Sequence, residues 1–111
     1  MALLTPDNTG QELTTTIADV FTVPADTARQ VISINASNID GTNDADVTVQ
    51  WTDASNSDAV VRLAYEVTVE AKNARPMMVG PLVLRAGDKL QAKASANGDI
   101  DLTVSYLDGA V

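Results

Sequence analysis

Cysteine and histidine are both absent from this chain of 111 residues. The chain therefore has no disulfide, no thiol nucleophile and none of the usual Cys or His ligands of zinc. The lack of histidine also excludes a Ser-His-Asp triad and a histidine pH switch. We therefore expect a protein that is not an enzyme and that has no catalytic residue, no bound metal and no cofactor.

Basic residues are also scarce. Seven lysines and arginines stand against 15 acidic residues, which gives a formal net charge of −8. A chain this acidic repels phosphate backbones and anionic lipid, so we expect neither nucleic acid nor a membrane as its partner. No stretch approaches the roughly 20 apolar residues of a membrane-spanning helix. The N-terminus lacks the basic region of a signal peptide, which favours synthesis and folding in a cytoplasm.

The acidic residues are unevenly spread along the chain. Residues 1–61 contain nine acids and one base, Arg29, for a net charge of −8, whereas residues 62–111 contain six acids and six bases and are neutral. One interpretation is chance placement on a solvated surface. The other is a two-faced module that docks through its neutral second half and its uncharged first six residues, while the acidic part faces solvent or a basic partner.

Residues that favour strands are abundant. Thr and Val supply 25 residues and Ile five more, and β-branched side chains fit a pleated sheet better than a helix. Apolar and polar residues alternate with a period of two, which is typical of half-buried antiparallel strands. By this parity Trp51, Tyr65 and Tyr106 share a side with aliphatic residues. The alternation runs through residues 31–36, 47–52, 61–70, 90–96 and 100–106.

Two further segments are less regular. Residues 14–23 do not keep one parity, and a bulge near Asp19 would reconcile them. Residues 77–84 are interrupted by Gly80-Pro81, which predicts two short pieces or a bent edge strand. Seven or eight short strands separated by turn clusters indicate an all-β protein, an antiparallel β-sandwich or jelly roll over residues 14–111. Residues 1–13 keep no period, and we interpret them as an extended arm that is ordered only if something holds it.

The richest cluster of oxygen ligands is residues 40–46, Asp-Gly-Thr-Asn-Asp-Ala-Asp. Closely spaced hard ligands of this kind could bind Ca²⁺. The spacing does not match an EF-hand loop, because Gly41 follows the first aspartate directly and no glutamate closes the loop. A solvated turn between strands prefers the same residue types, and the turn is the better interpretation.

The N-terminal arm contains candidates for contact with a partner protein. A free arm gains nothing from apolar side chains, so Leu3, Leu4 and Pro6 predict an arm that docks on another surface.

A second set of candidates lies further along the chain. Met77 and Met78 belong to the segment that Gly80-Pro81 interrupts, where an adaptable pair of methionines is either a plug for the core or a contact patch. Val60 and Arg75 are weaker interface candidates, and a base on an edge strand also serves to prevent sheet-to-sheet aggregation.

Two stretches carry a family resemblance. The first is Phe21-Thr22-Val23-Pro24-Ala25-Asp26, followed by Val31-Ile32-Ser33-Ile34 and Asn38-Ile39-Asp40-Gly41; the second is Leu84-Arg85-Ala86-Gly87-Asp88-Lys89-Leu90-Gln91-Ala92 with Ser95, Gly98 and Val104-Ser105-Tyr106-Leu107. The first resembles a strand–turn–strand element of small tailed-phage virion proteins with a β-sandwich fold, and the second resembles their closing hairpin. Asp26 departs from that pattern, because glycine is usual there, so the turn type need not be the same.

The resemblance implies a virion structural protein, either a capsid decoration (cement) subunit or a neck, tail or baseplate accessory protein, and the decoration subunit is our leading hypothesis. Such a subunit assembles in the host cytoplasm and contacts the major capsid protein or another virion protein and its own copies, with a trimer favoured. No functional residues carry over from the family. A rival of another class is a carbohydrate-binding sandwich that reads glycans through Trp51, Tyr65 and acidic loops, which requires an aromatic ring with an exposed face.

Overall fold

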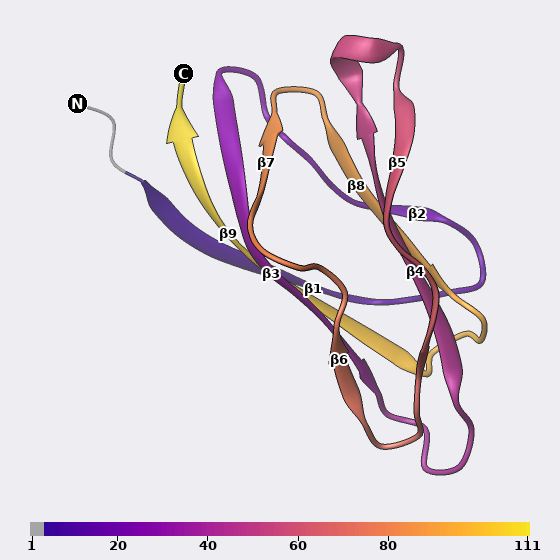
Figure 1. The fold of residues 1–111 in the computed structure, drawn as a ribbon. Coiled ribbons are helices and arrows are strands. Elements are labelled where there is room, and N and C mark those ends of the chain that lie inside the picture. Colours follow the sequence, from indigo (N-terminus) through magenta and orange to yellow (C-terminus); the bar gives the residue numbers. More distant parts are fainter. Residues whose placement is uncertain (1–3) are drawn as a thin grey trace.

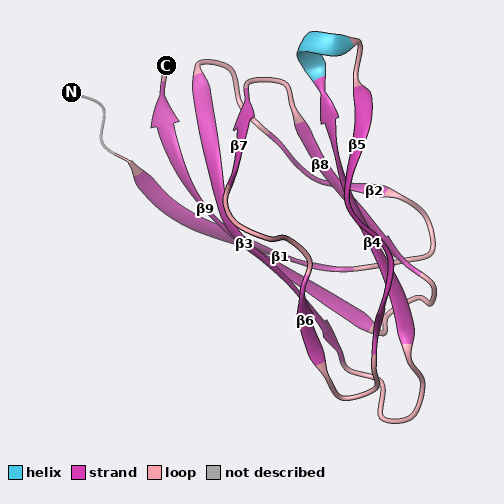
Figure 2. Cartoon of the chain, in the orientation of Figure 1, coloured by secondary structure: helices cyan, strands magenta, loops and turns pink. Residues whose placement is uncertain are grey.

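The computed structural model describes residues 4–111, which fold into nine strands and one short 3-10 turn, η1 (Ala54–Asn56). The strands form two antiparallel sheets that pack face to face (Figures 1 and 2). Sheet A contains, in spatial order, β1 (Thr5–Glu12), β9 (Ile100–Ala110) and β3 (Thr27–Asn38), with β6 (Ala74–Pro76) and β7 (Leu82–Arg85) both on the far side of β3. Sheet B contains β2 (Ala18–Thr22), β8 (Lys89–Ala94), β4 (Ala45–Asp53) and β5 (Ala59–Val69) in that order. The all-β sandwich expected from the sequence is confirmed.

The strand pairs are nested in the chain. β1 pairs with β9, β2 with β8, β3 with β6 and β7, and β4 with β5. This is the winding of a jelly roll, in which a long antiparallel hairpin wraps into two sheets. One strand of the roll is divided here into β6 and β7, which both pair with β3. Among residues 4–111, no helix has the length and apolarity that a membrane crossing requires.

The core lies between the two sheets. Each inner strand buries alternate residues, so the period-two pattern in the sequence becomes an apolar inner layer and a polar outer layer. β8 contributes Leu90, Ala92 and Ala94 to this layer. The largest fully buried side chains are Leu13, Val23, Val31, Ile34, Val47, Val49, Val69, Leu84, Leu90, Ile100, Leu102 and Val104.

Most of the segment interpreted as an arm is held by the sheet. Residues 5–12 form β1, which pairs with β9 along its whole length, from Thr5 opposite Asp108 to Glu12 opposite Asp101. The sequence pattern did not predict a strand here, because β1 is a polar edge strand with no fully buried side chain. Leu3 lies outside the described residues.

Bulges shift the parity of three strands, β2, β3 and β5, and the bulge of β3 lies between Val31 and Ser33. A register shift between Asp19 and Phe21 confirms the bulge expected near Asp19. β5 has two bulges that the sequence did not predict, one at Tyr65-Glu66 and one at Leu63. Val67 lies opposite Val47 and Ala64 lies opposite Val49, so two residues of β5 share the position facing Thr48. The parity expected for Tyr65 is therefore wrong beyond this bulge, and its side chain is 60% exposed instead of buried.

Within the segment 77–84 only the part after Gly80-Pro81 forms a strand, so the expectation of two short strand pieces there is wrong in its first piece. β6 ends at Pro76 and β7 begins at Leu82, directly after Gly80-Pro81. Both pieces lie at the edge of sheet A beside β3. The residues between them, from Met77 onward, cross from one piece to the other without strand structure.

Two aspartates, Asp26 and Asp40, shape the turns in which they lie. Asp26 has φ +56°, so it adopts the left-handed conformation for which glycine is usual in the resembling element. Asp40 organises the loop 40–46, because its Oδ1 accepts hydrogen bonds from the backbone N–H of Asn43 at 2.9 Å and of Thr42 at 2.8 Å. These bonds hold the pKa of Asp40 at about 2. The cluster thus has the turn geometry that its composition favoured.

Candidate interaction surfaces

The middle part of the outer face of sheet A is built from cross-strand rows of uncharged residues. Strand register sets the rows, because residues that are directly opposite in an antiparallel pair point to the same side. We call three consecutive rows the neutral face, since none of its residues is charged. The rows are Pro6–Leu107–Gln30–Val83, then Asn8–Ser105–Ser33, then Gly10–Thr103–Asn35–Pro76.

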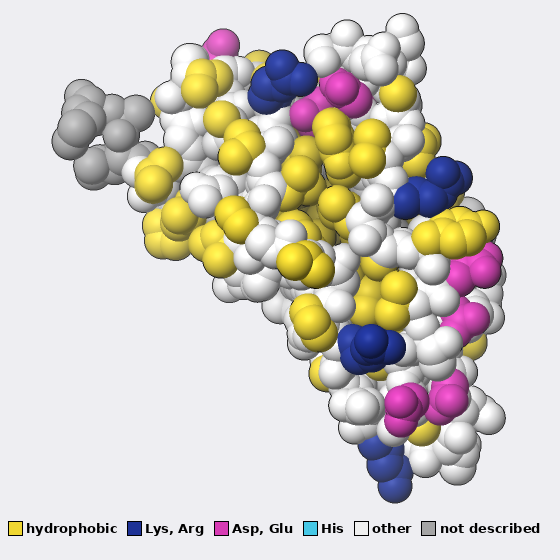
Figure 3. Space-filling view, in the orientation of Figure 1, with side chains coloured by type: hydrophobic (Ala, Val, Ile, Leu, Met, Phe, Trp, Pro, Cys, Tyr) yellow, Lys and Arg dark blue, Asp and Glu magenta, His cyan; other side chains and the backbone are white. Residues whose placement is uncertain are grey.

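One end of the neutral face is apolar. Leu4 is 61% exposed and lies over Gly109, where a Cβ would stand only 3.2 Å from the Leu4 Cδ2 atom. Together with Val83, Leu107 and Val111, Leu4 lines a shallow hollow of about 290 Å³. Figure 3 shows hydrophobic side chains gathered on this side of the molecule, near the N-terminal end of the described chain.

The opposite end of the neutral face is acidic. Glu12 and Asp101 lie opposite each other in the β1–β9 pair, one row beyond Gly10 and Thr103. Between the two ends, the polar side chains have no partner within residues 4–111: the amides and hydroxyls of the face make no side-chain hydrogen bond to another residue. The neutral face therefore presents unused donors and acceptors to whatever lies on it.

The outer face of sheet B is charged, and its side chains bond to one another across the strands. Gln50 donates to Gln91 at 2.8 Å, and Gln91 in turn donates to Asp19 at 2.8 Å. Lys89 lies 3.7 Å from the same aspartate. Figure 3 shows acidic and basic side chains along the side of the molecule that β5 occupies. The two outer faces thus differ in charge and in how fully their polar groups are already paired.

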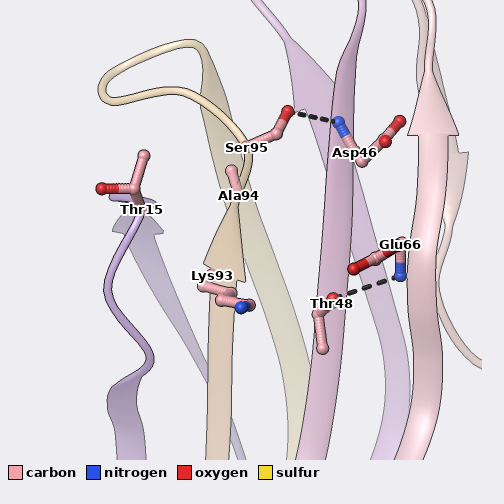
Figure 4. Close-up of a pocket in the computed structure, with 7 residues that line it drawn as sticks. All are labelled: Thr15, Asp46, Thr48, Glu66, Lys93, Ala94 and Ser95. Carbon is pink, nitrogen blue, oxygen red and sulfur yellow. Dashed lines mark hydrogen bonds between the residues drawn. The ribbon is translucent and has the colours of Figure 1, made fainter.

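A polar hollow of about 270 Å³ lies on sheet B (Figure 4). Its lining residues are Thr15, Asp46, Thr48, Glu66, Lys93, Ala94 and Ser95. Two short side chains fix the backbone here, since Ser95 Oγ accepts from the N–H of Asp46 at 2.8 Å and Thr48 Oγ1 accepts from the N–H of Glu66 at 3.1 Å. The hollow can offer hydrogen bonds to a small polar molecule. Within residues 4–111, no three acidic side chains gather closely enough to hold a metal ion.

One aromatic ring is available at the surface. The Arg62 guanidinium lies 5.4 Å from the centre of the Tyr65 ring, and Tyr65 directly precedes Glu66 of the polar hollow. Trp51 is half-buried and packs against the core, and Tyr106 is 8% exposed. The core placement expected for Tyr106 is therefore confirmed. Tyr65 supplies the exposed ring that the carbohydrate-binding interpretation requires.

A third surface is the seam between β5 and β6. Arg75 crosses it and donates to the carbonyl oxygen of Thr68 at 3.0 Å. Met78 is half-buried in the seam, whereas Met77 is only 3% exposed and belongs to the core. Of the two alternatives for the methionine pair, Met77 is a core plug and has almost no surface to offer a partner. We define the seam by its lining residues Leu63, Ala64, Val67, Arg75, Pro76, Met77, Met78 and Val79.

The structure distributes the described interface candidates over three places. Leu4 and Pro6 lie together at the apolar end of sheet A. Arg75 and Met78 lie in the seam. Val60 is 44% exposed and lies on β5 opposite Thr52, apart from both groups. No single surface contains all of these residues.

Sequence reasoning missed most of the neutral face. Its central residues, such as Ser33, Asn35 and Thr103, are ordinary polar members of alternating strands and carry no signal of their own. What makes them a surface is the register between β1, β9 and β3, which joins residues almost a hundred positions apart. The uneven distribution of charge along the chain was also a poor guide, because the neutral and charged surfaces follow the two sheets and not the two halves of the sequence.

No protein-family model matches the chain, and no curated protein matches it in sequence. Several solved structures are nonetheless similar in three dimensions. A chain from the disulfide-linked pili of Bacillus endospore appendages has a TM-score of 0.58 at 11% sequence identity, with 100% of this chain and 91% of that chain covered. A chain from the acidic stable capsid of Helicobacter pylori bacteriophage KHP30 has a TM-score of 0.57 at 9% identity, with 96% of this chain and 87% of that chain covered.

A third similar structure is the infectious bursal disease virus VP2 subviral particle. Its TM-score is 0.50 at 10% identity, with 99% of this chain but only 33% of that chain covered. The first two likenesses extend over nearly the whole of both chains, so they concern the complete sandwich and not one hairpin. At these identities the chain shares its fold, a two-sheet antiparallel sandwich, with subunits of a pilus and of viral particles.

Proposed function

We propose that this protein is a structural subunit of a bacteriophage virion, and more specifically a capsid decoration subunit. It acts through surface contacts with the major capsid protein and with its own copies, and it has no catalytic activity. The observation that carries the proposal is the likeness in fold to the phage KHP30 capsid chain, which extends over 87% of that chain. The sequence resemblance of residues 20–107 to small phage virion proteins supports the same role.

The surfaces of the chain suit this role. A subunit of a particle needs faces that pack on neighbours, and the neutral face and the seam are surfaces of that kind. Leu4 and Pro6 are our candidates for contact with the capsid, because both lie at the apolar end of sheet A, with Leu4 exposed over Gly109. The resemblance favours a trimer on the particle, placed on the capsid surface after assembly in the host cytoplasm.

The test is to locate the chain in particles. Virions are purified by density gradient, the protein is quantified by mass spectrometry, and a cryo-EM map finds its density. We expect many copies on the capsid surface. Density confined to the neck, tail or baseplate would replace the decoration role by an accessory one. Absence from virions, or presence in cell-surface filaments such as the pili that the chain resembles in fold, would overturn the proposal.

Point variants test the contact residues. Leu4→Asp places a charge at the apolar end of sheet A, and we expect its copy number per particle to fall by about tenfold or more. Thr22→Glu, on the charged outer side of sheet B beside Lys89, is the matched control and should bind as the original chain does. Equal occupancy of Leu4→Asp and the control would remove this end from the capsid contact.

The exposed Tyr65 ring favours a second candidate function, recognition of carbohydrate. A sugar ring could stack on Tyr65 while its hydroxyls bond to the polar hollow that begins at Glu66. Binding to an array of bacterial surface glycans measures this directly. The candidate requires binding that Tyr65→Ala abolishes and that Val60→Ala, also on β5, leaves intact. An array without signal removes it.

A further inference from the structure

We infer that two copies of this chain associate through the neutral face of sheet A. The inference goes beyond the proposed function and does not depend on it, because it concerns the isolated protein in solution. The occupant of the face is a second, identical copy. Four observations lead to it: the distribution of charge, the unused polar groups, the state of the sheet edges and the size of the face.

Charge decides where two copies can meet. Each copy carries a formal net charge of −8, so contact through a charged surface brings like charges together. The neutral face has three consecutive rows without a charged side chain, in a chain in which 20% of residues are charged. Its acidic row, with Glu12 and Asp101, lies at one end only. A two-fold arrangement with antiparallel sheets places the acidic rows of the two copies at opposite ends, where they do not repel.

The polar groups of the face are suited to an interface. The side chains of Gln30, Asn35 and Thr103 are exposed and bond to no other residue among those described. On sheet B the corresponding groups already bond to each other, from Gln50 through Gln91 to Asp19. A second copy of the neutral face offers the same amides and hydroxyls, which both donate and accept, so identical faces can satisfy one another.

Pairing by sheet edges is disfavoured. β1 carries Pro6 and Asp7 at its exposed edge, and both residue types interrupt strand addition. β5 is bulged where Tyr65 and Glu66 face Thr48. At the remaining edge of sheet A the backbone is divided by Gly80-Pro81. Because the edges are blunted in this way, self-association through a face is favoured over an extended sheet.

The size of the face sets how strongly two copies can bind. Four strand positions at about 4.8 Å spacing, crossed by three rows that together span about six residues at about 3.4 Å per residue, give a face of roughly 400 Å². Two such faces bury roughly 800 Å², which is in the range of weak, transient complexes. In the middle row, a bulge of β3 places Ile32, which is 48% exposed, next to Ser33, so this row offers one apolar side chain among small polar ones. The size predicts a reversible dimer, not a permanent one.

Sedimentation equilibrium of the purified full chain, from micromolar to millimolar concentration, tests the inference. We expect the average mass to rise from that of one copy to that of two. High salt should strengthen association, because it screens the net charge while the face has no ion pairs to lose. Ser105→Glu, in the middle row of the face, should weaken the dimer by about tenfold or more, because it buries an unpaired charge. Thr22→Glu is the matched control on sheet B and should leave the dissociation constant unchanged.

Ser105→Lys distinguishes the effect of the face from the effect of net charge. This change reduces the net negative charge by one but still buries an unpaired charge in the middle row, so it too should weaken the dimer. A Ser105→Lys chain that associates more tightly would show that net charge controls association and would overturn the inference. A monomer at millimolar concentration, a mass of three copies or equal weakening by Thr22→Glu would also overturn it. Circular dichroism melting curves establish that each variant is folded. Absence of the chain from virions would remove the proposed function and leave this result intact.

Discussion

Arg29 and Asp108 face each other on β3 and β9 and form a two-pronged ion pair, with Nε 2.7 Å from Oδ1 and Nη2 2.9 Å from Oδ2. The Arg29 guanidinium also lies 3.9 Å from the centre of the Tyr106 ring and 4.5 Å from that of Phe21. Phe21 belongs to sheet B, so the one base of the first 61 residues joins the two sheets. The hydrogen bond to Asp108 is the main cause that raises the pKa of Arg29.

Removal of this charge should destabilise the fold. Arg29→Met keeps much of the volume of the side chain but leaves Asp108 half-buried without its partner. We expect the free energy of unfolding in urea to fall by about 3 kcal/mol. The double variant Arg29→Met with Asp108→Leu should recover part of that loss, because no unpaired charge remains. A loss below about 0.5 kcal/mol would mean that the pair behaves as an exposed one.

Asp40 should make the stability depend on acid pH. Its pKa is lowered from the ordinary value of 3.8 to about 2 in the folded chain, chiefly by the backbone hydrogen bond from Asn43. A carboxylate with a depressed folded-state pKa stabilises the fold above its unfolded pKa, and that contribution disappears as the pH falls through the folded value. The original chain should therefore exceed Asp40→Ala in stability above about pH 4, and the two should converge near pH 2.

Urea unfolding of both chains at a series of pH values measures this difference. Asp44→Ala, in the same loop, serves as a control for the general effect of removing one negative charge. A stability difference between Asp40→Ala and the original chain that stays constant from neutral pH to pH 2 would show that Asp40 acts through loop packing and not through its ionised form.

The sequence predicted the sheets better than the surfaces. Alternation identified the strands around Ile34, Val49 and Leu102, because burial of one face imposes a period of two on each strand. It missed β1, which is a polar edge strand whose burial never requires apolar side chains. It misplaced Tyr65, because two bulges of β5, one at Tyr65-Glu66 and one at Leu63, interrupt the alternation of this strand.

The candidate surfaces were harder to predict for a different reason. Leu4 and Pro6 were recognisable as apolar residues without a core role, but their neighbours Val83 and Leu107 reach them only through strand register. Register depends on turns and bulges that leave weak marks in one sequence.

Asp88 should hold the η1 turn against the β7–β8 turn. Its side chain is buried, with Oδ1 accepting from the N–H of Ala54 at 2.9 Å and Oδ2 accepting from the N–H of Arg85 at 2.9 Å. Asp88→Ala leaves both N–H groups without that partner, and we expect a loss of about 2 kcal/mol in unfolding free energy. Hydrogen exchange should accelerate at Ala54 and Arg85 in particular. Unchanged protection at both amides would mean that these bonds do not form in solution.

The two neighbouring methionines should behave differently. Met77 is part of the core, so Met77→Ala leaves a cavity, and we expect the free energy of unfolding to fall by about 3 kcal/mol. Met78 is half-buried in the seam, so Met78→Ala should cost less than about 1.5 kcal/mol, because part of its side chain is in water in either state. Urea denaturation of both variants measures the contrast.

If the seam contacts a partner, Met78→Ala should weaken binding more than Met77→Ala does, which is the opposite of their order in stability loss. If a partner covers Met78, then Met78→Ala weakens that complex while leaving a stable chain, whereas Met77→Ala weakens it only in proportion to the fraction of chains that unfold. Conversion of Met77 to leucine separates these effects, because leucine fills a similar volume and should restore stability to within about 1.5 kcal/mol of the original chain. Equal stability losses for Met77→Ala and Met78→Ala would contradict the assignment of Met77 as the core plug.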